Sequence, residues 1–377
     1  MATQSSHNML KDVKILDLSR VLAGPLCTML LGDMGAEVLK VERPLMGDET
    51  RGWGPPFDDL GTSAYYLSVN RNKLGVVLDL DAPADRTLLL SLASGADVVV
   101  ENFRPGVLAR RALDSETVRA RFPGLVWCTI VGFANAPNRP GYDFVVQAES
   151  GWMSVTGAPD GAAMKHGVAL ADVIAGKDAA IAILGALVER SRTGVGASLS
   201  ISLSGSAEAA LVNVAQNALV SGAAPRRWGN AHANLVPYQL FEALDRSIVI
   251  AAGTDAQWVA CANALGLSEL AGEDALRTNA GRLAHRDRIV GAMAAALGGR
   301  PSAHWREQLD AVGVPNGVVR SVPEVLECID ASALTGMPPS VPGTVRLAPP
   351  RLGEHTAVVR KLGWGAFRGL PDRGSES

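Results

Sequence analysis

Short apolar runs rich in β-branched residues alternate with longer segments of helical character over the first 130 residues. Five of these runs predict strands, at Val13–Leu18, Glu37–Glu42, Gly75–Leu80, Asp97–Glu101 and Leu125–Val131. Strands that alternate with helices indicate βαβ units, and nearly continuous apolar runs are typical of strands buried on both faces. The pattern therefore predicts an α/β fold built on a parallel sheet.

A carboxylate stands at the head of an apolar helix predicted further along the chain. In HGVALADVIAGKDAAIAILGAL, apolar residues recur at helical spacing from Val173 through Ile181 and Val188, and Asp172 falls at the N-cap or in the first turn. Backbone N–H groups and the helix dipole favour an ionised side chain there. Such a carboxylate is either a helix cap, the common role of Asp at this position, or a nucleophile, and the stretch alone leaves both roles open.

The pattern changes after Thr193-Gly194. SLSISL alternates polar and apolar positions, and the following residues 206–220 predict one long helix. Further on, SIVIAA and VPNGVV predict strands, and DAQWVACANALG and HWREQLDAVG predict helices. The C-terminal segment is rich in Pro and Gly, and we expect it to run extended over another surface of the protein.

Composition removes several classes of protein. The 377 residues carry a net charge of −3, which gives no global support for a nucleic-acid-binding surface. Four widely spaced cysteines and six scattered histidines argue against a disulfide framework and against a metal site. The polar N-terminus does not resemble a signal peptide, and no apolar run reaches the roughly 18 residues of a membrane span. We therefore expect a cytoplasmic protein that binds neither nucleic acid nor membrane, with no metal.

Polar residues follow several of the predicted strands, where ligands of α/β sheets bind. Arg20, Arg43 and Arg104 each follow a strand, Asn102 precedes Arg104, and Arg110 comes a helical turn or so later. A guanidinium group matches the geometry of a phosphate, so these residues suit a phosphorylated ligand. Ordinary surface ion pairs are the alternative for each of them.

Other segments are less specific. The glycine fingerprints of nicotinamide and nucleoside-triphosphate sites are absent. Trp53 and Trp152 lie in glycine-rich segments, where each either lines a pocket or fills a core. His232 lies between Gly229 and Pro237, which indicates a loop.

Taken in order, these segments resemble the class III CoA-transferases, the family that includes formyl-CoA transferase and α-methylacyl-CoA racemase. The resemblance rests on VKILDLSRVLAGPLCTMLLGDMGAEVLKVERP, YYLSVNRNK, VVVENFRPGVL, GYDFVVQAESGWMSVTG, VALADVIAG, RRWGNAHANLVPYQLF and PPRLGEHT, and it covers nearly the whole chain from Val13 to Thr356. Within the family, GDETRGWGPPF, SAYYLSVNRNK and RRWGNAH look most like the branch that moves CoA between dicarboxylates, of the succinyl-CoA:glutarate type.

The resemblance implies roles for individual residues. Asp172 matches the nucleophilic aspartate, which attacks an acyl-CoA thioester and passes through an aspartyl anhydride and an aspartyl-CoA thioester. CoA-binding positions are matched by Leu22, Ala23, Arg43, Leu78, Asn102, Phe103, Arg104, Arg110, Arg139 and Tyr142. A dicarboxylate also needs a cation for its far carboxylate, for which Arg20, Arg51, Arg226, Arg227 and His232 are candidates.

The resemblance also implies an architecture. We expect a large Rossmann-like CoA-binding domain (residues 1–196), a linker helix region (197–228), a small α+β domain (229–328) and a C-terminal segment (329–377) that returns to the large domain. Two chains would interlock as a homodimer. The substrates would be an acyl-CoA, succinyl-CoA by preference, and a small carboxylic acid, with no permanently bound cofactor.

The sequence departs from the family pattern at several positions. Pro140 and Asp81 stand where formyl-CoA transferase has lysines, Arg139 being a possible substitute for the first, and its glycine-rich loop has no counterpart, since AAGTDAQW contains only Gly253. Tyr142 stands where racemases have a histidine base, and a phenol with a pKa near 10 is a poor base at neutral pH. This favours a transferase over a racemase. A non-catalytic acyl-CoA-binding protein and a Rossmann-type dehydrogenase are further alternatives, opposed by Asp172 and by the missing glycine fingerprint respectively.

Overall fold

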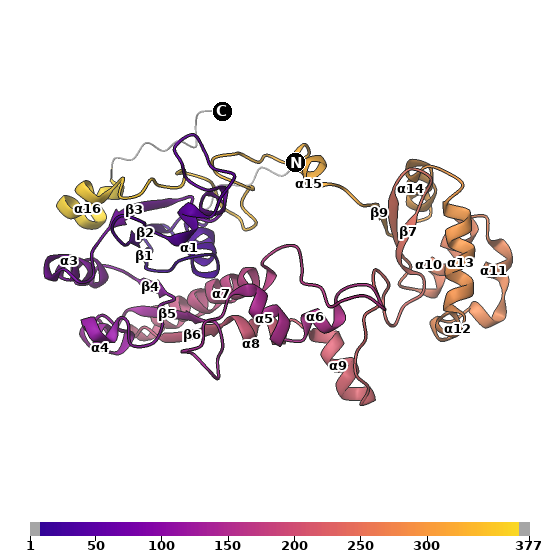
Figure 1. Ribbon diagram of the computed structural model, residues 1–377, viewed down its shortest axis with the longest axis horizontal. Coiled ribbons are helices and arrows are strands. Elements are labelled where there is room, and N and C mark those ends of the chain that lie inside the picture. Colours follow the sequence, from indigo (N-terminus) through magenta and orange to yellow (C-terminus); the bar gives the residue numbers. More distant parts are fainter. Residues whose placement is uncertain (1–7, 369–377) are drawn as a thin grey trace. The chain divides into compact units, whose positions relative to one another are not determined.

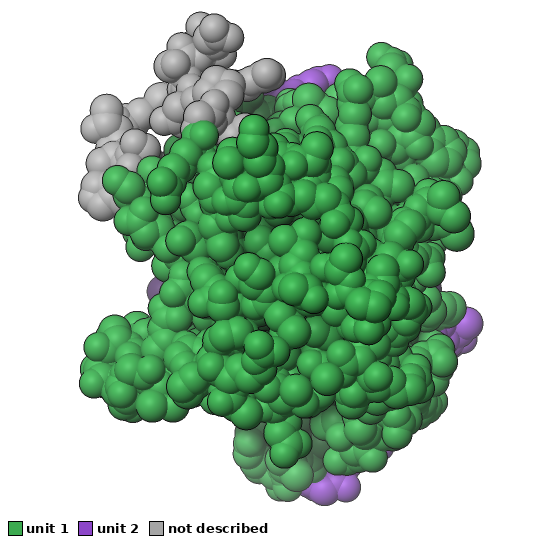
Figure 2. Space-filling view, turned by 90° about the vertical axis from the view of Figure 1, so that its left-hand side faces the viewer, with its two compact units in different colours: residues 1–152, 165–220, 329–377 green, residues 153–164, 221–328 purple. Residues whose placement is uncertain are grey.

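The computed structural model describes residues 8–368. The chain forms two compact units, which Figure 2 shows in different colours. Unit 1 comprises residues 1–152, 165–220 and 329–377, and unit 2 comprises residues 153–164 and 221–328. The first and the last described segments of the chain therefore belong to the same unit. Within residues 8–368, no helix has the length and apolar character needed to cross a membrane.

Unit 1 is built on a six-stranded sheet in which every neighbouring pair of strands is parallel (Figure 1). Its strands are β1 (Lys14–Asp17), β2 (Glu37–Glu42), β3 (Lys73–Val77), β4 (Val98–Glu101), β5 (Val126–Val131) and β6 (Ser198–Ser202). The order β3-β2-β1-β4-β5-β6 is that of a doubly wound dinucleotide-binding sheet, and the direction of the order reverses between β1 and β4. The five strand predictions and the α/β prediction are confirmed.

Unit 1 also contains helices. They are α1 (Ala23–Asp33), α2 (Ala64–Leu67), α3 (Pro83–Ser94), α4 (Ser115–Arg121), α5 (Asp143–Glu149), α7 (Leu170–Thr193), α8 (Leu203–Ala209), α9 (Val212–Ser221) and α16 (Thr356–Leu362). The single helix predicted over residues 206–220 is wrong, because the chain breaks between α8 and α9 and Val212 adopts a left-handed backbone conformation with φ of 37°. A short helix, α6 (Trp152–Val155), lies where the sequence passes from unit 1 to unit 2.

The long helix α7 packs on α1 through small residues. Its buried positions are Ala171, Asp172, Ala175, Gly176, Ala179, Ala180, Ile183 and Ala186. The apolar residues Ile181 and Val188, by which the sequence predicted the helix, are 67% and 53% exposed. The helix is thus confirmed, but its packing face consists mainly of alanine and glycine, which allow a close approach to α1.

Unit 2 contains a three-stranded antiparallel sheet with helices. Its strands are β7 (Tyr238–Glu242), β8 (Ser247–Ala251) and β9 (Asn316–Val318), in the order β7-β8-β9. Its helices are α10 (Asp255–Ala264), α11 (Ser268–Gly272), α12 (Asn279–Ala284), α13 (Arg286–Leu297), α14 (Ser302–Ala311) and α15 (Val322–Leu326). A separate apolar core that includes Trp258, Ile289 and Leu309 holds this unit together.

The returning C-terminal segment covers the free edge of the large sheet. Asn72 N–H donates to the carbonyl of Leu347, and Gly75 in the edge strand β3 exchanges bonds with His355. Residues 347–355 therefore lie along this edge of the sheet. Covering an edge strand in this way protects it from pairing with other chains.

A buried ionic network joins the carboxyl end of β1, strand β2 and the first residue of β3. Lys73 Nζ donates to Asp17 at 3.0 Å and Lys40 Nζ to Asp48 at 3.1 Å, and all four side chains are fully buried. Burial lowers the pKa of Lys73 to about 8. Burial alone would raise the pKa of Asp17, but Lys73 and Lys40 lower it to about 2. The charges of the two lysines and the two aspartates cancel, and Asp48 lies next to the loop that begins at Ser19.

Candidate active site

Asp172 is the third residue of α7, in its first turn. The N-cap position is Ala169, which offers no side-chain hydrogen bond to the helix. The Asp172 residue is only 8% exposed. The first-turn prediction is confirmed, but Asp172 is not the N-cap of this helix, so the capping explanation does not account for it.

The helix is capped instead by a residue from elsewhere in the chain. Oδ1 of Asp143 accepts hydrogen bonds from the N–H groups of Ala171 at 2.8 Å and Asp172 at 3.3 Å. The Gln147 side-chain amide donates to Asp143 Oδ2 at 2.6 Å and accepts from His166 N–H at 2.9 Å. Sequence reasoning missed Asp143, because it lies 29 residues before Asp172 and no local capping pattern marks it.

Asp172 also contacts the N-terminus of a second helix. The backbone N–H of Ala23, the first residue of α1, lies near the Asp172 carboxylate and acts to lower its pKa. Leu22, at the N-cap of α1, has no capping side chain, so first-turn N–H groups of α1 are left to bind an anion. Gly176 permits this approach, since a Cβ atom at that position would lie 2.6 Å from the carbonyl oxygen of Ala23.

The pKa of Asp172 is raised to about 7. Burial is the largest cause and the charge of Asp143 the second, and together they outweigh the hydrogen bond from Ala23. This corrects the expectation that the helix environment favours the ionised form. A buried carboxylate with a pKa near neutrality is typical of functional sites.

A cavity of about 370 Å³, here called the Asp172 cavity, opens beside this carboxylate. Besides Asp172 it is lined by Arg20, Val21, Ala23, Glu49, Asn102, Phe103, Arg104, Ile130, Val131, Gly132, Pro137, Arg139, Pro140, Gly141, Tyr142 and Leu203. The structure thus brings six of the residues singled out as CoA-binding positions to one cavity with Asp172: Ala23, Asn102, Phe103, Arg104, Arg139 and Tyr142.

A second cavity, of about 220 Å³ and here called the Arg43 cavity, is lined by Arg43, Leu78, Leu80, Val107 and Arg111 among others. Arg20 and Phe103 line both cavities, so the two adjoin. The guanidinium carbon of Arg20 lies 5.3 Å from the centre of the Phe103 ring. Arg43 and Leu78, both predicted CoA-binding positions, therefore lie one cavity away from Asp172.

The loop between β1 and α1, which joins the two cavities, is held by two side chains. Asn102 accepts from the N–H of Arg20 at 2.9 Å and donates to its carbonyl at 2.8 Å. Both carboxylate oxygens of Asp48 lie 3.3 Å from the backbone nitrogen of Val21. Val21 has φ of 72°, a strained conformation for a β-branched residue, and such strain is kept where surrounding contacts impose it.

Six of the predicted site residues line neither cavity, among them Arg226 and Arg227, which belong to unit 2. Leu22 is the N-cap of α1, and Arg110 is exposed, whereas its neighbour Arg111 lines the Arg43 cavity. Arg51 is held by an ion pair with Glu42 at 2.7 Å. His232 belongs to unit 2, where its Nδ1 accepts the N–H of Asn234 at 3.0 Å.

Aromatic side chains gather near the Asp172 cavity. The Trp53 ring lies 5.2 Å from that of Tyr65 and 6.3 Å from that of Tyr142. Burial and then the charge of Asp172 raise the pKa of Tyr65 to about 12, which places this phenol in the electrostatic field of Asp172. Trp152 differs, since it is buried and donates to the carbonyl of Ala207 at 2.8 Å. The sequence left open whether each tryptophan lines a pocket or fills a core. In the structure, Trp152 fills a core and Trp53 belongs to the aromatic group near the cavity.

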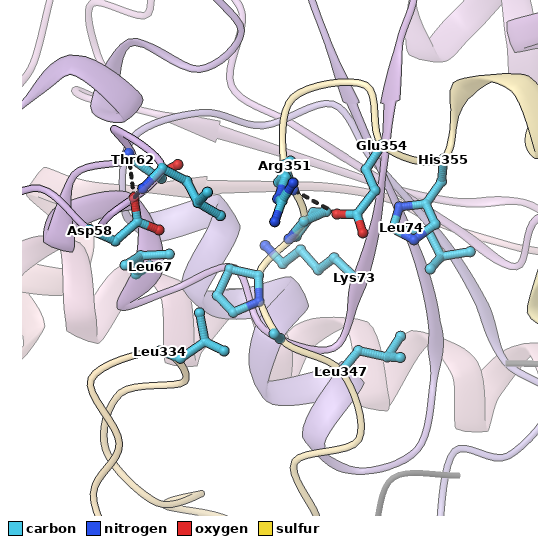
Figure 3. A pocket seen from close by; sticks show the side chains of 14 residues that line it. Asp58, Thr62, Leu67, Lys73, Leu74, Leu334, Leu347, Arg351, Glu354 and His355 are labelled. Atoms are coloured by element: carbon cyan, nitrogen blue, oxygen red, sulfur yellow. Dashed lines mark hydrogen bonds between the residues drawn. The ribbon is translucent and has the colours of Figure 1, made fainter. Parts of the chain in front are cut away.

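Another cavity of unit 1, of about 340 Å³, contains none of these site residues (Figure 3). It lies between the segment at Asp58–Leu67, strand β3 and the returning C-terminal segment. In Figure 3, Asp58 accepts the N–H of Thr62 and Glu354 accepts the N–H of Arg351, so its acidic groups serve local turns. This cavity reflects the packing of the C-terminal segment on the sheet edge.

The protein thus has an α/β fold and a candidate site in which a buried carboxylate with a pKa of about 7 lines the first of two adjoining cavities. The sequence profile described as CoA-transferase family III matches residues 10–356, and the chain belongs to this family. It is a family III CoA-transferase, and enzymes of this class use CoA thioesters as substrates.

Several known proteins are similar to this chain. Succinyl-CoA:glutarate CoA-transferase of Mus musculus is 38% identical over 93% of this chain and 86% of its own length. Succinate–glutarate CoA-transferase of Agrobacterium fabrum is 36% identical over 93% of this chain and 94% of its own. Succinyl-CoA:mesaconate CoA-transferase of Haloarcula marismortui is 40% identical over 70% of this chain and 69% of its own.

The fold has a solved counterpart as well. A crystal structure of a CaiB/BaiF family protein from Brucella suis superimposes with a TM-score of 0.81 and 36% sequence identity, covering 93% of this chain and 98% of that one. The similarity therefore extends over both units of the chain.

Proposed function

We propose that this enzyme transfers CoA from a donor acyl-CoA, succinyl-CoA by preference, to a small dicarboxylic acid, with Asp172 as the nucleophile. The observation that carries the proposal is the position of the Asp172 carboxylate, which is buried, lies near the backbone N–H of Ala23 and is open to a cavity. The succinyl-CoA:glutarate and succinyl-CoA:mesaconate relatives support the choice of substrates.

The reaction has four steps. The Asp172 carboxylate attacks the thioester carbonyl, which yields an acyl-aspartyl anhydride and CoA thiolate. The thiolate then attacks the aspartyl carbonyl, giving an aspartyl-CoA thioester and releasing the donor acid. The acceptor carboxylate attacks this thioester and expels the thiolate, and the thiolate takes the acceptor acyl group from the new anhydride. Asp172 is regenerated, and no net proton transfer is required.

The geometry suits each demand of this scheme. A carboxylate nucleophile keeps the acyl group activated as an anhydride, which a serine ester would not do. In this proposal, the N–H groups at the start of α1, beside Asp172, stabilise the negative charge that develops on the attacked carbonyl oxygen. The pKa of about 7 leaves Asp172 partly ionised at neutral pH without a tightly stabilised charge.

The two cavities suit the two ends of CoA. The thioester end belongs at Asp172, and Phe103, which lines both cavities, marks the passage to the Arg43 cavity. There, Arg43 and Arg111 present guanidinium groups to the phosphates, and Leu78, Leu80 and Val107 provide apolar contact for the base.

The proposal includes a homodimer whose chains interlock, as the family resemblance implies. Exposed apolar side chains support association: no residue of α9 is buried, and Leu219 and Val220 are 77% and 79% exposed. We also propose the division into large domain, linker region, small domain and returning segment, and a reducing compartment such as the cytoplasm, which the four unpaired cysteines support. Light scattering coupled to size-exclusion chromatography tests the dimer, and a monomer at micromolar concentration would refute it.

The catalytic proposal is tested with purified enzyme, succinyl-CoA and a panel of small acids that includes glutarate and mesaconate, followed by mass spectrometry of the acyl-CoA products. We expect a new thioester with the wild type and none with Asp172→Ala. A product that survives this substitution would refute the role of Asp172. Deuterium uptake at the α-carbon of an acyl-CoA in the absence of any acceptor would instead identify an isomerase.

A further inference from the structure

Two arginines of unit 2 share one tryptophan ring. The guanidinium carbon of Arg226 lies 3.8 Å from the centre of the Trp228 ring, and that of Arg286 lies 4.7 Å from it. Arg226 comes from the chain just before Trp228, and Arg286 is the first residue of α13. Two cations stacked on one ring attract the ring but repel each other.

No carboxylate neutralises this pair. Within residues 8–368, Arg226 has neither a hydrogen bond nor an ion pair, and it is exposed. Arg286 Nη2 donates to the carbonyls of His232 and Ala233, at 3.0 and 2.9 Å, whereas its Nη1 is buried and has no acceptor among the described residues. Burial, and next the charge of Arg226, lower the pKa of Arg286, and Asp287 only partly offsets them. A buried donor without an acceptor is costly, and a bound anion would remove that cost.

The other candidates for a carboxylate-binding cation are already engaged. Arg51 is paired with Glu42 and Arg20 with Glu49, each at 2.7 Å. Arg227 donates to the carbonyls of Ala158 and Gly161. Of the four arginines that the sequence offered for this role, Arg226 alone has its guanidinium group unengaged by protein acceptors among the described residues.

We propose that Arg226 and Arg286, held against Trp228, form an oxyanion-binding site that takes a carboxylate of the dicarboxylic acid. Guanidinium groups match the planar, two-oxygen geometry of a carboxylate, and Trp228 limits their freedom before the ligand arrives. The inference rests on the proposed function for the identity of the acid. A phosphate of CoA shares the oxyanion chemistry, and the experiment separates the two sources.

The first experiment measures steady-state kinetics with succinyl-CoA and either glutarate or butyrate as acceptor. Arg226→Ala should raise KM for glutarate at least tenfold, as expected for the loss of a charge-assisted contact, and should also raise KM for succinyl-CoA, because the succinyl group carries a free carboxylate of its own. KM for butyrate, which has no second carboxylate, should not change. Arg306→Ala, at an exposed arginine of α14 in the same unit, is the matched control and should change none of these values. Equal glutarate KM values for the two variants would overturn the proposal.

The second experiment does not depend on turnover. Titration of glutarate into Asp172→Ala should change the intrinsic tryptophan fluorescence, and the change should disappear when Trp228→Phe or Arg226→Ala is added. This signal is expected even if the transferase reaction is not found, so failure of the proposed function is distinguishable from failure of the site. Arg286→Lys retains the positive charge but replaces the planar guanidinium group with an ammonium group, and it should weaken glutarate binding in the same assay.

The third arm compares CoA with dephospho-CoA. If Arg226→Ala abolishes the preference for CoA over dephospho-CoA and leaves glutarate binding intact, the site takes a phosphate and the carboxylate assignment is wrong. If the preference for CoA is unchanged while glutarate binding weakens, the assignment to the acid is supported.

Discussion

Oδ1 of Asp143 lies 3.3 Å from the backbone nitrogen of Asp172, so one carboxylate caps the helix that carries the other. The bond fixes the first turn of α7, in which Asp172 stands, and Gln147 in turn fixes Asp143. The same contact brings a second negative charge close to the Asp172 carboxylate and raises its pKa. Asp143 therefore orients Asp172 and tunes its ionisation through one side chain.

The first prediction separates these two effects of Asp143. Asp143→Asn keeps an oxygen that can accept the helix N–H groups but removes the charge. We expect kcat/KM of the wild type to rise with pH through an apparent pKa of about 7, because in the proposed mechanism the ionised form of Asp172 is the nucleophile. In Asp143→Asn, this rise of kcat/KM should occur at lower pH. A pH–rate profile from pH 5 to 9 measures the shift, and identical limbs would show that the charge of Asp143 does not act on Asp172.

The second prediction concerns stability. The folded-state pKa of Asp172, about 7, lies above the ordinary value near 3.9 of an unfolded chain. Its contribution to stability is therefore complete below about pH 4 and is lost as the pH rises through 7. Asp172→Asn should be more stable than the wild type at pH 8, by on the order of a few kcal/mol, and the difference should shrink towards pH 4. Urea unfolding at both pH values measures this, and a difference independent of pH would contradict it.

How much of this site the sequence predicts depends on how local each signal is. The strands β1 to β5 are readable because each is a buried apolar run, and Asp172 is readable as a polar residue at the start of an apolar helix. Three features depend instead on contacts between distant segments, which no local spacing encodes. They are the capping of α7 by Asp143, the effect of the Asp172 charge on the pKa of Tyr65 and the position of Arg111 in the wall of the Arg43 cavity.

Unit 2 shows the same limit. The strand β7 was not predicted, because its burial comes from pairing with β8 and from the helices of its own unit. Likewise, the packing face of α7 could not be recognised from large apolar residues, since alanines and Gly176 form it and Ile181 remains exposed. Tertiary contacts decide which face of a helix is buried when its sequence is apolar all round.

The third prediction tests the contact between α7 and α1. Gly176→Ala introduces a Cβ atom 2.6 Å from the carbonyl oxygen of Ala23, so the two helices must separate. We expect a loss of about 1–3 kcal/mol in the free energy of unfolding and a lower kcat, because Ala23 N–H moves away from Asp172. Gly185→Ala in the same helix is the control, since a Cβ atom there meets nothing within 4 Å. The control should be neutral or stabilising, and equal effects of the two substitutions would refute the close-contact argument.

The fourth prediction concerns the edge of the large sheet. Nδ1 of His355 accepts the N–H of Gly75 at 3.2 Å, which requires an unprotonated Nδ1. Burial lowers the pKa of His355 below its ordinary value. The contribution of this group to stability is therefore complete above about pH 6.5 and is lost as the pH falls through that region.

Two variants of His355 test this hydrogen bond. His355→Ala should cost about 1 kcal/mol at pH 8 through the lost hydrogen bond. His355→Asn offers an acceptor that does not titrate, so its stability relative to the wild type should improve between pH 7 and pH 5. Thermal unfolding at these pH values provides the measurement. A constant difference between the wild type and His355→Asn would show that the imidazole does not titrate within this contact.

The fifth prediction compares two adjacent arginines at the far end of the proposed CoA site. The family resemblance selects Arg110, whereas in the structure Arg111 lines the Arg43 cavity and is held there by Asp81 at 2.6 Å. Asp81 is largely exposed, so this ion pair adds little stability, and Arg111→Ala should leave folding intact. Because a phosphate contact by a guanidinium group is charge-assisted, we expect Arg111→Ala to raise Kd for CoA about tenfold and to have a smaller effect on dephospho-CoA. Arg110→Ala is the matched control, and isothermal titration calorimetry of both variants decides between the two residues. A loss of affinity in Arg110→Ala alone would mean that the resemblance, and not the cavity, identifies the phosphate contact.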